Sequence, residues 1–482
     1  MTGTQNAKVQ FAQYFTPQSV ADFMAGMLSP SSSMMNCRIL DPGAGEGSLG
    51  IALTKLLLKN GEKPSSIFIE IEDEAFHKLS DNVCEAEISE SSVLIHNDFI
   101  SAGAKLLKQG ARFSHIIMNP PYFKLRRGDS ASMRLAKNGV DVTNIYAGFV
   151  WLAARMLDDN GQLVAIVPRS FCNGPYFYKF REFLVEHFSL DAMHVFGSRD
   201  SVFSKDKVLQ ENIIFRISKR QQQKQVGISS STDQTFSDVI EVTYSFNDVV
   251  SDKESGYIIS IPSHQKTQPL TRSFFSSLDD LGIKVSTGPV VDFRSEEAIS
   301  ATPKMRSVPL LYPAHMDAGS IIWPIENLSK RGQYYLLPPN LLDSAGLSPM
   351  CVDKNVSPAD GYYVVTRRFS SKEEKRRIYA AVVNPDEMGV QGVAFENHLN
   401  YFHHNKHGLD RDLAYGLTAY LNSALLDSYF RTFSGHTQVN ATDLRNIPYP
   451  TPSQLRGLGK QVLAEKERVD MVADEEILRV NA

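Results

Sequence analysis

Between residues 36 and 217, short aliphatic runs alternate with stretches of helical periodicity, and this rhythm limits the folds open to the chain. The runs CRIL, SIFIEIE, VLIH and HIIM have the length and composition of buried strands. SLGIALTKLLLKNG places its leucines on one helical face, and NIYAGFVWLAARML indicates a second helix, followed by a polar DDNG turn and a further strand. With two later strand-like runs, LDAMHVF and ENIIFRIS, the pattern predicts an α/β fold with a mostly parallel sheet.

The rhythm ends at KRQQQKQ, residues 219–225, a polar stretch of low complexity that is typical of a domain boundary. Residues 226–450 mix short β-like runs with many Pro, Gly and Ser, and residues 451–482 have the pattern of a terminal helix. We therefore predict an α/β domain over residues 1–220, a mixed α+β domain over 226–450 and a helical tail over 451–482.

Charge and cysteine usage narrow the class of protein. A net charge of −4 and a pI near 6.3 argue against a chain that binds polyanions over its whole surface, although local basic patches can still hold nucleic acid. Four scattered cysteines predict neither a disulfide framework nor a zinc site and fit a reducing cytosol. FHHNK at 402–406 has no carboxylates at ligand spacing, so we expect no bound metal. No apolar run approaches the ~20 residues that span a bilayer.

A glycine-rich loop stands between the first strand and the first helix, in the segment ILDPGAGEGSLG. Gly43, Gly45 and Gly47 allow close approach of the backbone to a ligand, and Asp41 ends the strand. The next strand ends in Glu70, whose carboxylate can accept both hydroxyls of a ribose. NAD, FAD and S-adenosylmethionine all satisfy this arrangement, so it indicates a nucleoside cofactor without selecting one.

The following strand ends in the segment HNDFI. Asp98 can accept a hydrogen bond from an adenine amino group, and Phe99 can lie against the adenine ring. The position of this pair behind the glycine loop and Glu70 makes it a candidate for the base end of the same cofactor.

The strand HIIM runs directly into Asn119-Pro120-Pro121-Tyr122, where two prolines end it because they remove two backbone donors. An exocyclic amino group on a base or an amide is a weak nucleophile, since its lone pair is delocalised. The Asn119 side-chain oxygen and the Pro120 carbonyl can hold its two N–H bonds out of plane, which localises the lone pair toward an electrophilic methyl group. Tyr122 then offers a stacking face for the planar target. The motif predicts amino-group methylation, with S-adenosylmethionine as the cofactor.

The order of AQYFTP at 12–17, DPGAGEG, IEIE, NDF and NPPY resembles the gamma-class, TaqI-like DNA adenine-N6 methyltransferases of restriction–modification systems. The resemblance covers roughly residues 10–218 and implies a Rossmann-like class I methyltransferase fold, followed by a DNA target-recognition domain. The cofactor contacts that it implies are Tyr14, Thr16, Pro17, Asp41, Gly43, Gly45, Glu70, Asp98 and Phe99. The catalytic residues that it implies are Asn119, Pro120 and Tyr122, with Phe203 as a second aromatic against the target base.

A base inside a duplex must be flipped out of the stack before it can be methylated, at a cost of a few kcal/mol, and the Tyr122 and Phe203 rings would compensate for the lost stacking in double-stranded DNA. The basic segment that follows NPPY suits phosphate contact and contributes Lys124, Arg126, Arg127 and Arg134. Two later segments are candidates for DNA recognition and contribute Arg367, Arg368, His436, Gln438 and Asn440. The first of them, VVTRRFSSKEEKRRIY, forms either a DNA-facing strip or a solvated helix face.

The predicted function is site-specific methylation of adenine N6 in a flipped-out base, which protects host DNA from a cognate restriction endonuclease in the cytoplasm of a bacterial or archaeal cell. Cytosine N4, an RNA base and a protein glutamine are alternative acceptors, because the same motif serves other planar amino groups. A non-catalytic DNA specificity subunit is the alternative from another class of protein. It would account for residues 226–450 but leave the glycine loop and NPPY unexplained.

Overall fold

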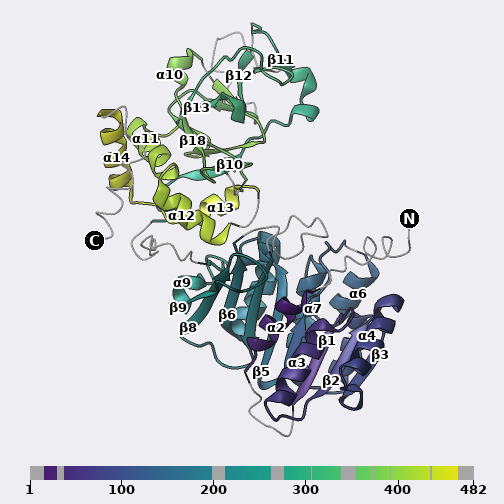
Figure 1. Cartoon of the computed structure of the whole chain (residues 1–482). Helices are drawn as coiled ribbons and strands as arrows, with labels where there is room; N and C mark the ends of the chain where they lie inside the picture. The colour runs from purple at the N-terminus through teal and green to yellow at the C-terminus, as the bar shows by residue number, and fades with distance from the viewer. Residues whose placement is uncertain are drawn as a thin grey trace. The chain divides into compact units, whose positions relative to one another are not determined.

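The computed structural model describes residues 16–29, 37–126, 128–197, 212–261, 276–305, 307–317, 319–337, 354–371, 374–390, 392–434 and 437–464 (Figure 1). The chain forms two compact units, Met1–Pro262 and Ser263–Ala482. No helix among the described residues is long and apolar enough to cross a membrane.

The first unit is built on a nine-stranded sheet with the order β3-β2-β1-β4-β5-β7-β6-β8-β9 (Figure 1). The strands are β1 (Arg38–Pro42), β2 (Ser65–Glu70), β3 (Ser92–His96), β4 (Phe113–Met118), β5 (Leu157–Pro168), β6 (Ser189–Phe196), β7 (Asn212–Ser218), β8 (Gln225–Ser231) and β9 (Ile240–Ser245). Strands β1 to β5 pair in parallel, and β7 runs antiparallel to both β5 and β6. The predicted α/β fold, a Rossmann-like class I methyltransferase sheet, is confirmed.

Helices cover both faces of this sheet. They are α2 (Gln18–Gly26), α3 (Ser48–Lys59), α4 (Asp73–Glu85), α5 (Phe99–Lys108), α6 (Ser130–Lys137), α7 (Ile145–Ala154), α8 (Tyr178–His187) and α9 (Phe246–Val249). One layer joins α2 to α3, and another joins α5, α7 and α8. The central strands are buried on both faces, which explains why their sequences are continuous aliphatic runs instead of alternating patterns.

The strand order reverses between β1 and β4, whose neighbours lead away in opposite directions. In an open α/β sheet, a crevice forms at such a switch point, outside the carboxyl ends of the strands. The glycine loop follows β1 and Asn119 follows β4, so both flank this crevice.

Two details differ from the sequence-based expectation. The DDNG segment is part of β5 and not a turn before it, because Asn160 N and Gly161 O both hydrogen-bond to the backbone of Lys219. The sheet also continues beyond the polar stretch 219–225, since β8 pairs with β6 and β9 pairs with β8. The first compact unit consequently extends to Pro262, past the predicted boundary.

The second unit mixes small sheets with helices. Its four-stranded antiparallel sheet contains β10 (Lys284–Thr287), β20 (Leu399–His403), β17 (Tyr363–Arg367) and β18 (Ala380–Val383). Its five-stranded sheet contains β11 (Ile299–Ser300), β15 (Tyr334–Leu336), β12 (Ser307–Leu311), β19 (Gly392–Phe395) and β16 (Val356–Pro358). A two-stranded sheet joins β13 (Met316–Asp317) and β14 (Ser320–Ile321).

The helices of this unit are α10 (Pro385–Met388), α11 (Arg411–Leu421), α12 (Ala424–Phe433), α13 (Ala441–Arg445) and α14 (Pro452–Ala464). Helix α14 occupies the start of the predicted helical tail and packs on α11, so this part of the tail belongs to the second unit. The rest of the predicted tail lies outside the described residues.

Candidate active site

A cavity of about 230 Å³ opens at the carboxyl ends of the strands in the first unit. It joins the glycine loop after β1 to the segments that follow β2, β3 and β4. The residues that line it are Thr16, Gly43, Ala44, Gly45, Glu46, Ser48, Leu49, Glu70, Ile71, Asp98, Ile100, Asn119, Pro121, Phe123, Ala131, Arg134, Ile145 and Phe149. The structure therefore brings together the predicted cofactor segments and the predicted catalytic asparagine, Asn119.

The glycine loop has the backbone conformation that its sequence predicts. Gly43, Gly45 and Gly47 have φ values of 75°, 57° and 91°, a region that other residues adopt only with strain. Amides of Gly43 and Ala44 donate to the carbonyl of Ile69, which ties the loop to β2. A Cβ on Gly45 would meet no atom within 4 Å, so this residue borders open space in the cavity.

Glu70 supports the loop as well as lining the cavity. Its Oε2 accepts a hydrogen bond from Gly45 N at 2.7 Å, and its Oε1 accepts from the amides of Ile71 and Glu72, each at 2.8 Å. The residue is only 2% exposed. Glu70 thus fixes the end of β2 against the glycine loop, and its carboxylate reaches the cavity from that position.

Asp98 and Phe99 occupy different surroundings. Asp98 lines the cavity and caps the first turn of α5, where Oδ2 accepts from Ser101 N at 3.1 Å and Oδ1 from Ile100 N at 3.3 Å. The Phe99 side chain is 2% exposed and packs with Phe149 in the core, at a ring-centroid distance of 4.9 Å. Of these two rings, Phe149 reaches the cavity wall.

Asp41 lies beneath the loop and outside the set of cavity-lining residues. It is 1% exposed, and its Oδ2 accepts from Gly50 N at 2.9 Å on α3. Burial raises the pKa of Asp41 to about 7, against the hydrogen bond from Gly50, which lowers it, and with a smaller contribution from the charge of Glu70, which raises it. Asp41 is therefore placed to hold the loop to α3.

The raised pKa of Asp41 predicts a pH-dependent stability. In the unfolded chain the Asp41 carboxyl has its ordinary pKa of 3.8, so between pH 3.8 and about 7 it is protonated in the folded protein and ionised in the unfolded chain. The stabilisation from this proton is therefore complete at low pH and is lost as the pH rises through 7. Asp41→Asn cannot ionise. Between about pH 5 and pH 7 we expect the wild type to lose roughly 2–3 kcal/mol relative to this variant. Calorimetric unfolding of both proteins across this range measures the difference, and parallel pH profiles would contradict the assignment.

Asn119 is held between two side chains at the edge of the cavity. Its Nδ2 donates to Thr16 Oγ1 at 3.1 Å, and its Oδ1 accepts a hydrogen bond from the Tyr122 hydroxyl at 2.7 Å. The same hydroxyl lies 3.0 Å from the carbonyl of Ile166 on β5. The FTP segment and the NPPY motif, about 100 residues apart in sequence, therefore meet at the side-chain amide of Asn119.

The Tyr122 ring is buried, with 8% of the residue exposed. It makes an edge contact with Tyr146, whose ring stacks on Phe177 at a centroid distance of 5.5 Å. In this arrangement Tyr122 directs its hydroxyl at Asn119, and Pro120 is buried beside it.

The basic segment after NPPY divides into two environments. Lys124 Nζ lies 5.8 Å from the ring centre of Tyr176, a residue that is 75% exposed, and Arg126 is also exposed. Arg134, which the sequence assigned to DNA contact, instead lines the cavity and pairs with Asp98. The exposed side chains of Lys124 and Arg126 therefore fit phosphate contact.

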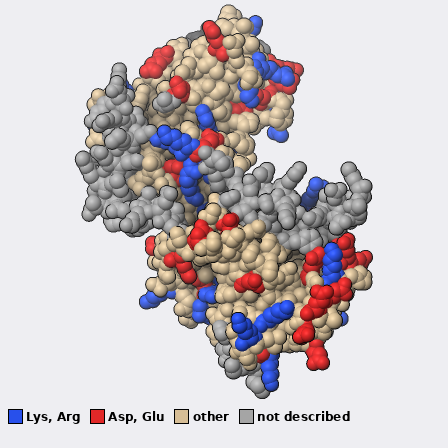
Figure 2. Space-filling view, in the orientation of Figure 1, with Lys and Arg blue, Asp and Glu red and all other residues tan. Residues whose placement is uncertain are grey.

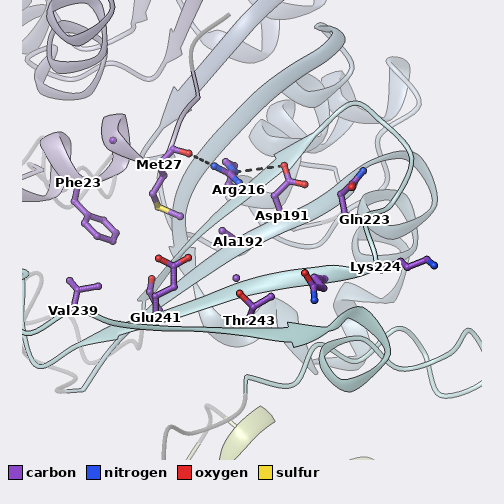
Figure 3. A pocket seen from close by; sticks show the side chains of 14 residues that line it. Phe23, Met27, Asp191, Ala192, Arg216, Gln223, Lys224, Val239, Glu241 and Thr243 are labelled. Atoms are coloured by element: carbon purple, nitrogen blue, oxygen red, sulfur yellow. Dashed lines mark hydrogen bonds and ion pairs between the residues drawn. The ribbon is translucent and has the colours of Figure 1, made fainter. Parts of the chain in front are cut away.

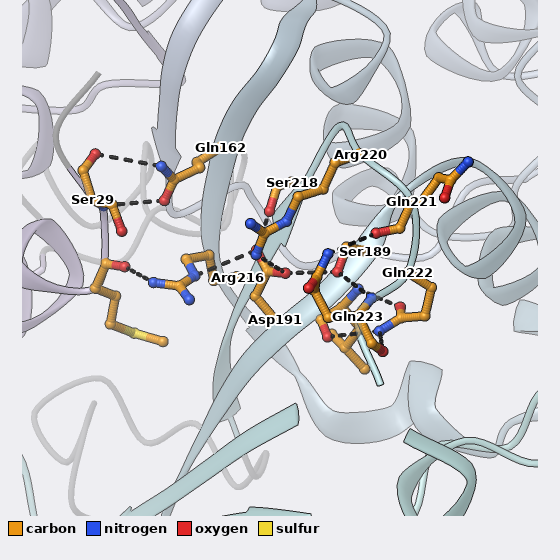
Figure 4. Close-up of polar contacts among 12 residues, drawn as sticks. Ser29, Gln162, Ser189, Asp191, Arg216, Ser218, Arg220, Gln221, Gln222 and Gln223 are labelled. Carbon is orange, nitrogen blue, oxygen red and sulfur yellow. Dashed lines mark hydrogen bonds and ion pairs between the residues drawn. The ribbon is translucent and has the colours of Figure 1, made fainter. Parts of the chain in front are cut away.

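A second, larger cavity of about 1060 Å³ lies between α2 and strands β6 to β9 of the same unit (Figure 3). None of the predicted site residues lines it. Two of its charged groups, Asp191 and Arg216, are held by other contacts: the Asp191 carboxylate accepts from Ser218 Oγ, pairs with Arg220 at 2.9 Å and lies 3.7 Å from Arg216 (Figure 4). Arg216 also donates to the carbonyl of Met27 and so joins α2 to β7. Size alone does not select the reaction centre.

In the second unit, the two segments proposed for DNA recognition lie side by side. Phe369 and Gln438 form an antiparallel bridge, Ser370 N donates to Thr437 O at 3.0 Å, and Val439 N donates to Arg368 O at 2.7 Å. Phe369 is 45% exposed on this ribbon.

The neighbouring residues are held by their own contacts. Arg368 Nη1 donates to Asn397 O at 2.6 Å, and the Arg367 guanidinium lies 4.8 Å from the ring centre of Tyr379. Asn440 directly precedes α13, and its backbone N–H donates to Asp443 Oδ2 at 2.8 Å. Asn440 thus serves as a helix cap.

The basic strip of residues 367–377 is not a continuous surface. Arg377 is fully buried: its guanidinium donates to Ser370 Oγ and to Ser434 O, and it lies 5.7 Å from the ring centre of Phe430. Arg377 therefore neither faces DNA nor belongs to a solvated helix face, and both interpretations were wrong for this residue. Its hydrogen bonds join the two segments that form the ribbon.

Four predicted site residues, Tyr14, Arg127, Phe203 and His436, lie outside the described residues. Pro17 precedes α2 without lining the cavity, and Thr16 does line it. Sequence reasoning missed the apolar wall formed by Ile71, Phe123 and Phe149. Ile71 and Phe123 are 45% and 40% exposed, unusual for large apolar side chains beside a core. Their place directly after Glu70 and Tyr122 was the available signal.

The chain is similar to known proteins of one family. Residues 46–203 match the Eco57I restriction-modification methylase family. The chain is 40% identical to the type II methyltransferase M.BsuBI of Bacillus subtilis over 478 residues, covering 96% of this chain and 92% of that protein. It is 39% identical to the type II methyltransferase M.PstI of Providencia stuartii, covering 95% and 90%. The solved DrdV–DNA complex is 13% identical and covers 96% of this chain and 58% of that one, with a TM-score of 0.49.

The two bacterial relatives align over almost the whole of both chains, so the similarity includes the second unit as well as the methyltransferase sheet. The resemblance drawn from the motif order is thereby confirmed. The chain belongs to the S-adenosylmethionine-dependent, adenine-specific type II DNA methyltransferases of restriction–modification systems, the family of M.BsuBI and M.PstI.

Proposed function

We propose that this chain methylates N6 of an adenine that has been flipped out of double-stranded DNA, with Asn119 and Pro120 as the catalytic residues. The observation that carries the proposal is the place of Asn119, which borders the same cavity as the glycine loop, Glu70 and Asp98. A target amino group at Asn119 would therefore lie next to whatever the glycine loop holds.

The cavity fits S-adenosylmethionine chemically. Gly45 leaves room for close approach, Glu70 and Asp98 provide carboxylates for hydroxyl and amino groups, and Ile71 and Phe149 provide apolar walls for a planar base. When bound, the cofactor supplies an electrophilic methyl group. We assign its binding to Thr16, Gly43, Gly45, Glu70 and Asp98, with Tyr14 and Pro17 as neighbours in the same segment. Asp41 supports the loop, and Phe99 supports Phe149.

Asn119 acts on the target amino group through its side-chain oxygen. This oxygen accepts from the Tyr122 hydroxyl in the structure, and it would accept one N–H of the target amino group when the base is bound. The Pro120 carbonyl accepts the second N–H. Holding both bonds in place moves the nitrogen lone pair out of conjugation with the ring, and the nitrogen releases a proton after it gains the methyl group. The rigid proline backbone keeps these acceptors preorganised.

Flipping the target base costs a few kcal/mol of lost stacking, and stacking on aromatic side chains of the enzyme would offset this cost. We assign one face of the base to Tyr122 and the other to Phe203. Tyr122 is buried and its hydroxyl donates to Asn119 Oδ1. When the base enters, this hydroxyl must either share Asn119 Oδ1 with the base amino group or give up its hydrogen bond.

DNA contacts are proposed in both units. Lys124, Arg126 and Arg127 would contact phosphates beside the active site, and Arg367, Arg368, His436 and Gln438 would lie in the recognition unit, with Asn440 supporting them as a helix cap. In the view of Figure 2, Lys and Arg side chains are scattered among Asp and Glu on the described surface. This distribution fits a few specific DNA contacts better than a broad polyanion-binding face.

The biological role follows from the substrate. Modification of one short sequence would protect host DNA from a restriction endonuclease that is a genetic partner of this chain. We place the reaction in the cytoplasm of a bacterial or archaeal cell, where the chromosome lies.

The test is transfer of a tritiated methyl group from S-adenosylmethionine to unmethylated plasmid DNA, followed by single-molecule sequencing of the product. We expect N6-methyladenine within one short motif. N4-methylcytosine would replace the adenine assignment by the cytosine alternative. Transfer to RNA or to a protein amide, but not to DNA, would overturn the DNA assignment. Absence of any transfer by a protein that binds DNA would favour the specificity-subunit alternative.

A further inference from the structure

We propose that Arg134 is a cofactor-positioning residue: its guanidinium forms part of the cofactor cavity wall and orients the Asp98 carboxylate, instead of contacting DNA phosphate. The inference rests on the proposed function, since it concerns the same site. It assigns a role to the helix that follows the NPPY segment.

Arg134 reaches the cavity from α6. Its Nη2 lies 3.3 Å from Asp98 Oδ2, and its Nη1 donates to Ser130 Oγ at 2.6 Å. The side chain is 42% exposed and belongs to the residues that line the cavity. One nitrogen of the Arg134 guanidinium is therefore bound to α6 itself, and another is bound to Asp98 in the segment after β3.

The two oxygens of the Asp98 carboxylate differ in the number of partners that they have. Oδ2 accepts from Ser101 N at 3.1 Å and from Ser101 Oγ at 2.9 Å, and it also carries the ion pair with Arg134. Oδ1 accepts a long hydrogen bond from Ile100 N at 3.3 Å. An amino group of a bound base would consequently find its acceptor at Oδ1, and Arg134 keeps the carboxylate turned so that Oδ1 is the oxygen with spare capacity.

The guanidinium also has an unused donor. Within the described part of the chain, Arg134 Nε is buried and has no hydrogen-bond partner. A buried donor without a partner is costly, and a ligand acceptor at the cavity wall would satisfy it. The planar guanidinium is suited to such edge contacts and to stacking on a base.

Helix packing fixes the position of Arg134. The next residue, Leu135, is 1% exposed and packs against Gly148 of α7, where a Cβ would come within 2.6 Å of a Leu135 methyl carbon. The anchored Leu135 therefore prevents α6 from swinging outward, and this keeps Arg134 directed toward Asp98. A residue that followed DNA on a free loop would lack such an anchor.

The test is calorimetric titration of S-adenosylmethionine into the full-length protein without DNA. We expect Arg134→Ala to weaken cofactor binding by about 10-fold, a loss of about 1.4 kcal/mol. Lys137→Ala is the matched control, because Lys137 is exposed on the same helix and outside the cavity, and it should bind the cofactor like the wild type. Arg134→Lys retains the charge without the fork of donors and should restore only part of the affinity.

Coupling to Asp98 supplies a second readout. If Arg134 acts through Asp98, the effect of Arg134→Ala should shrink in an Asp98→Asn background, since contacting residues are not additive. Melting temperatures of all variants exclude unfolding as the cause, and the Arg134→Lys variant keeps the test valid if the alanine variant is unstable.

DNA binding separates the two roles of Arg134. The slope of log affinity against log salt concentration should be unchanged in Arg134→Ala if the residue serves the cofactor. Unchanged cofactor affinity together with a slope reduced by about one phosphate contact would overturn the proposal and restore the DNA assignment. If the wild type bound no S-adenosylmethionine, the proposed function would fail together with this inference. Cofactor binding that is equal in wild type and variant would remove this inference alone.

Discussion

Asn119→Ala should slow methyl transfer to DNA by about 10²–10³-fold, the usual cost of removing one preorganised polar group that stabilises a transition state. The acceptor for one target N–H is lost, so the nitrogen lone pair stays delocalised into the ring. Binding of S-adenosylmethionine should change little, because the carboxylates and apolar walls of the cavity remain. Single-turnover methylation and calorimetric cofactor binding measure the two quantities separately.

Tyr122→Phe gives a graded comparison for this prediction. It keeps the ring but removes the hydroxyl that donates to Asn119 Oδ1 at 2.7 Å. We expect a smaller loss, about 10-fold, because the amide is less firmly oriented but still present. If Asn119→Ala transferred methyl groups at the wild-type rate, the catalytic assignment would be wrong, whatever the result for Tyr122→Phe.

Gly416→Ala should destabilise the second unit by roughly 3 kcal/mol, at the upper end of the usual cost of overpacking. Helices α11 and α14 cross with their backbones in contact: a Cβ on Gly416 would lie 1.8 Å from Leu455 O, and one on Gly459 would lie 1.8 Å from Asp412 O. Because backbone atoms cannot move aside by changing rotamer, the two helices would have to separate. Scanning calorimetry and amide hydrogen exchange in α11 and α14 measure the loss.

Gly457→Ala is the matched control, since Gly457 lies on α14 and a Cβ there would meet no atom within 4 Å. Alanine has the higher helix propensity, so this variant should be more stable by about 0.5–1 kcal/mol. Equal effects at Gly416 and Gly457 would show that helix propensity alone decides both results, and that the close crossing is not formed in solution.

Several features of this protein follow directly from local sequence. The glycine loop needs positive φ at Gly43, Gly45 and Gly47, and the sequence places glycine at each of these positions. The β4 strand must end at two prolines, so Asn119 stands at its carboxyl end in any parallel α/β arrangement. These are properties of single residues and of strand direction, and they led to the cofactor and the reaction without knowledge of distant contacts.

Tertiary structure decided which side chains reach the cavity. Asp41 and Phe99 lie in the expected motifs, but burial turns them into supports of the loop and of Phe149. Arg134 is one of several basic residues in a polar segment, and its place in the cavity depends on Leu135 packing against α7. Motif position gives a residue's neighbourhood, whereas the direction of its side chain depends on the packing of other elements.

The second unit shows the same division more sharply. The sequence indicated two separate candidate segments, one with Arg367 and Arg368 and one with Gln438 and Asn440. Only the fold shows that Phe369 and Gln438 pair in one ribbon, held by the buried Arg377. A run of basic residues has no periodicity that distinguishes an exposed arginine from a buried one. The sequence by itself therefore determined where the proposed reaction centre lies, because strand ends and local backbone conformation suffice for that. Tertiary structure alone decided the contacts that support the cavity and the pairing of the two candidate recognition segments, because these contacts join segments that are distant in the chain.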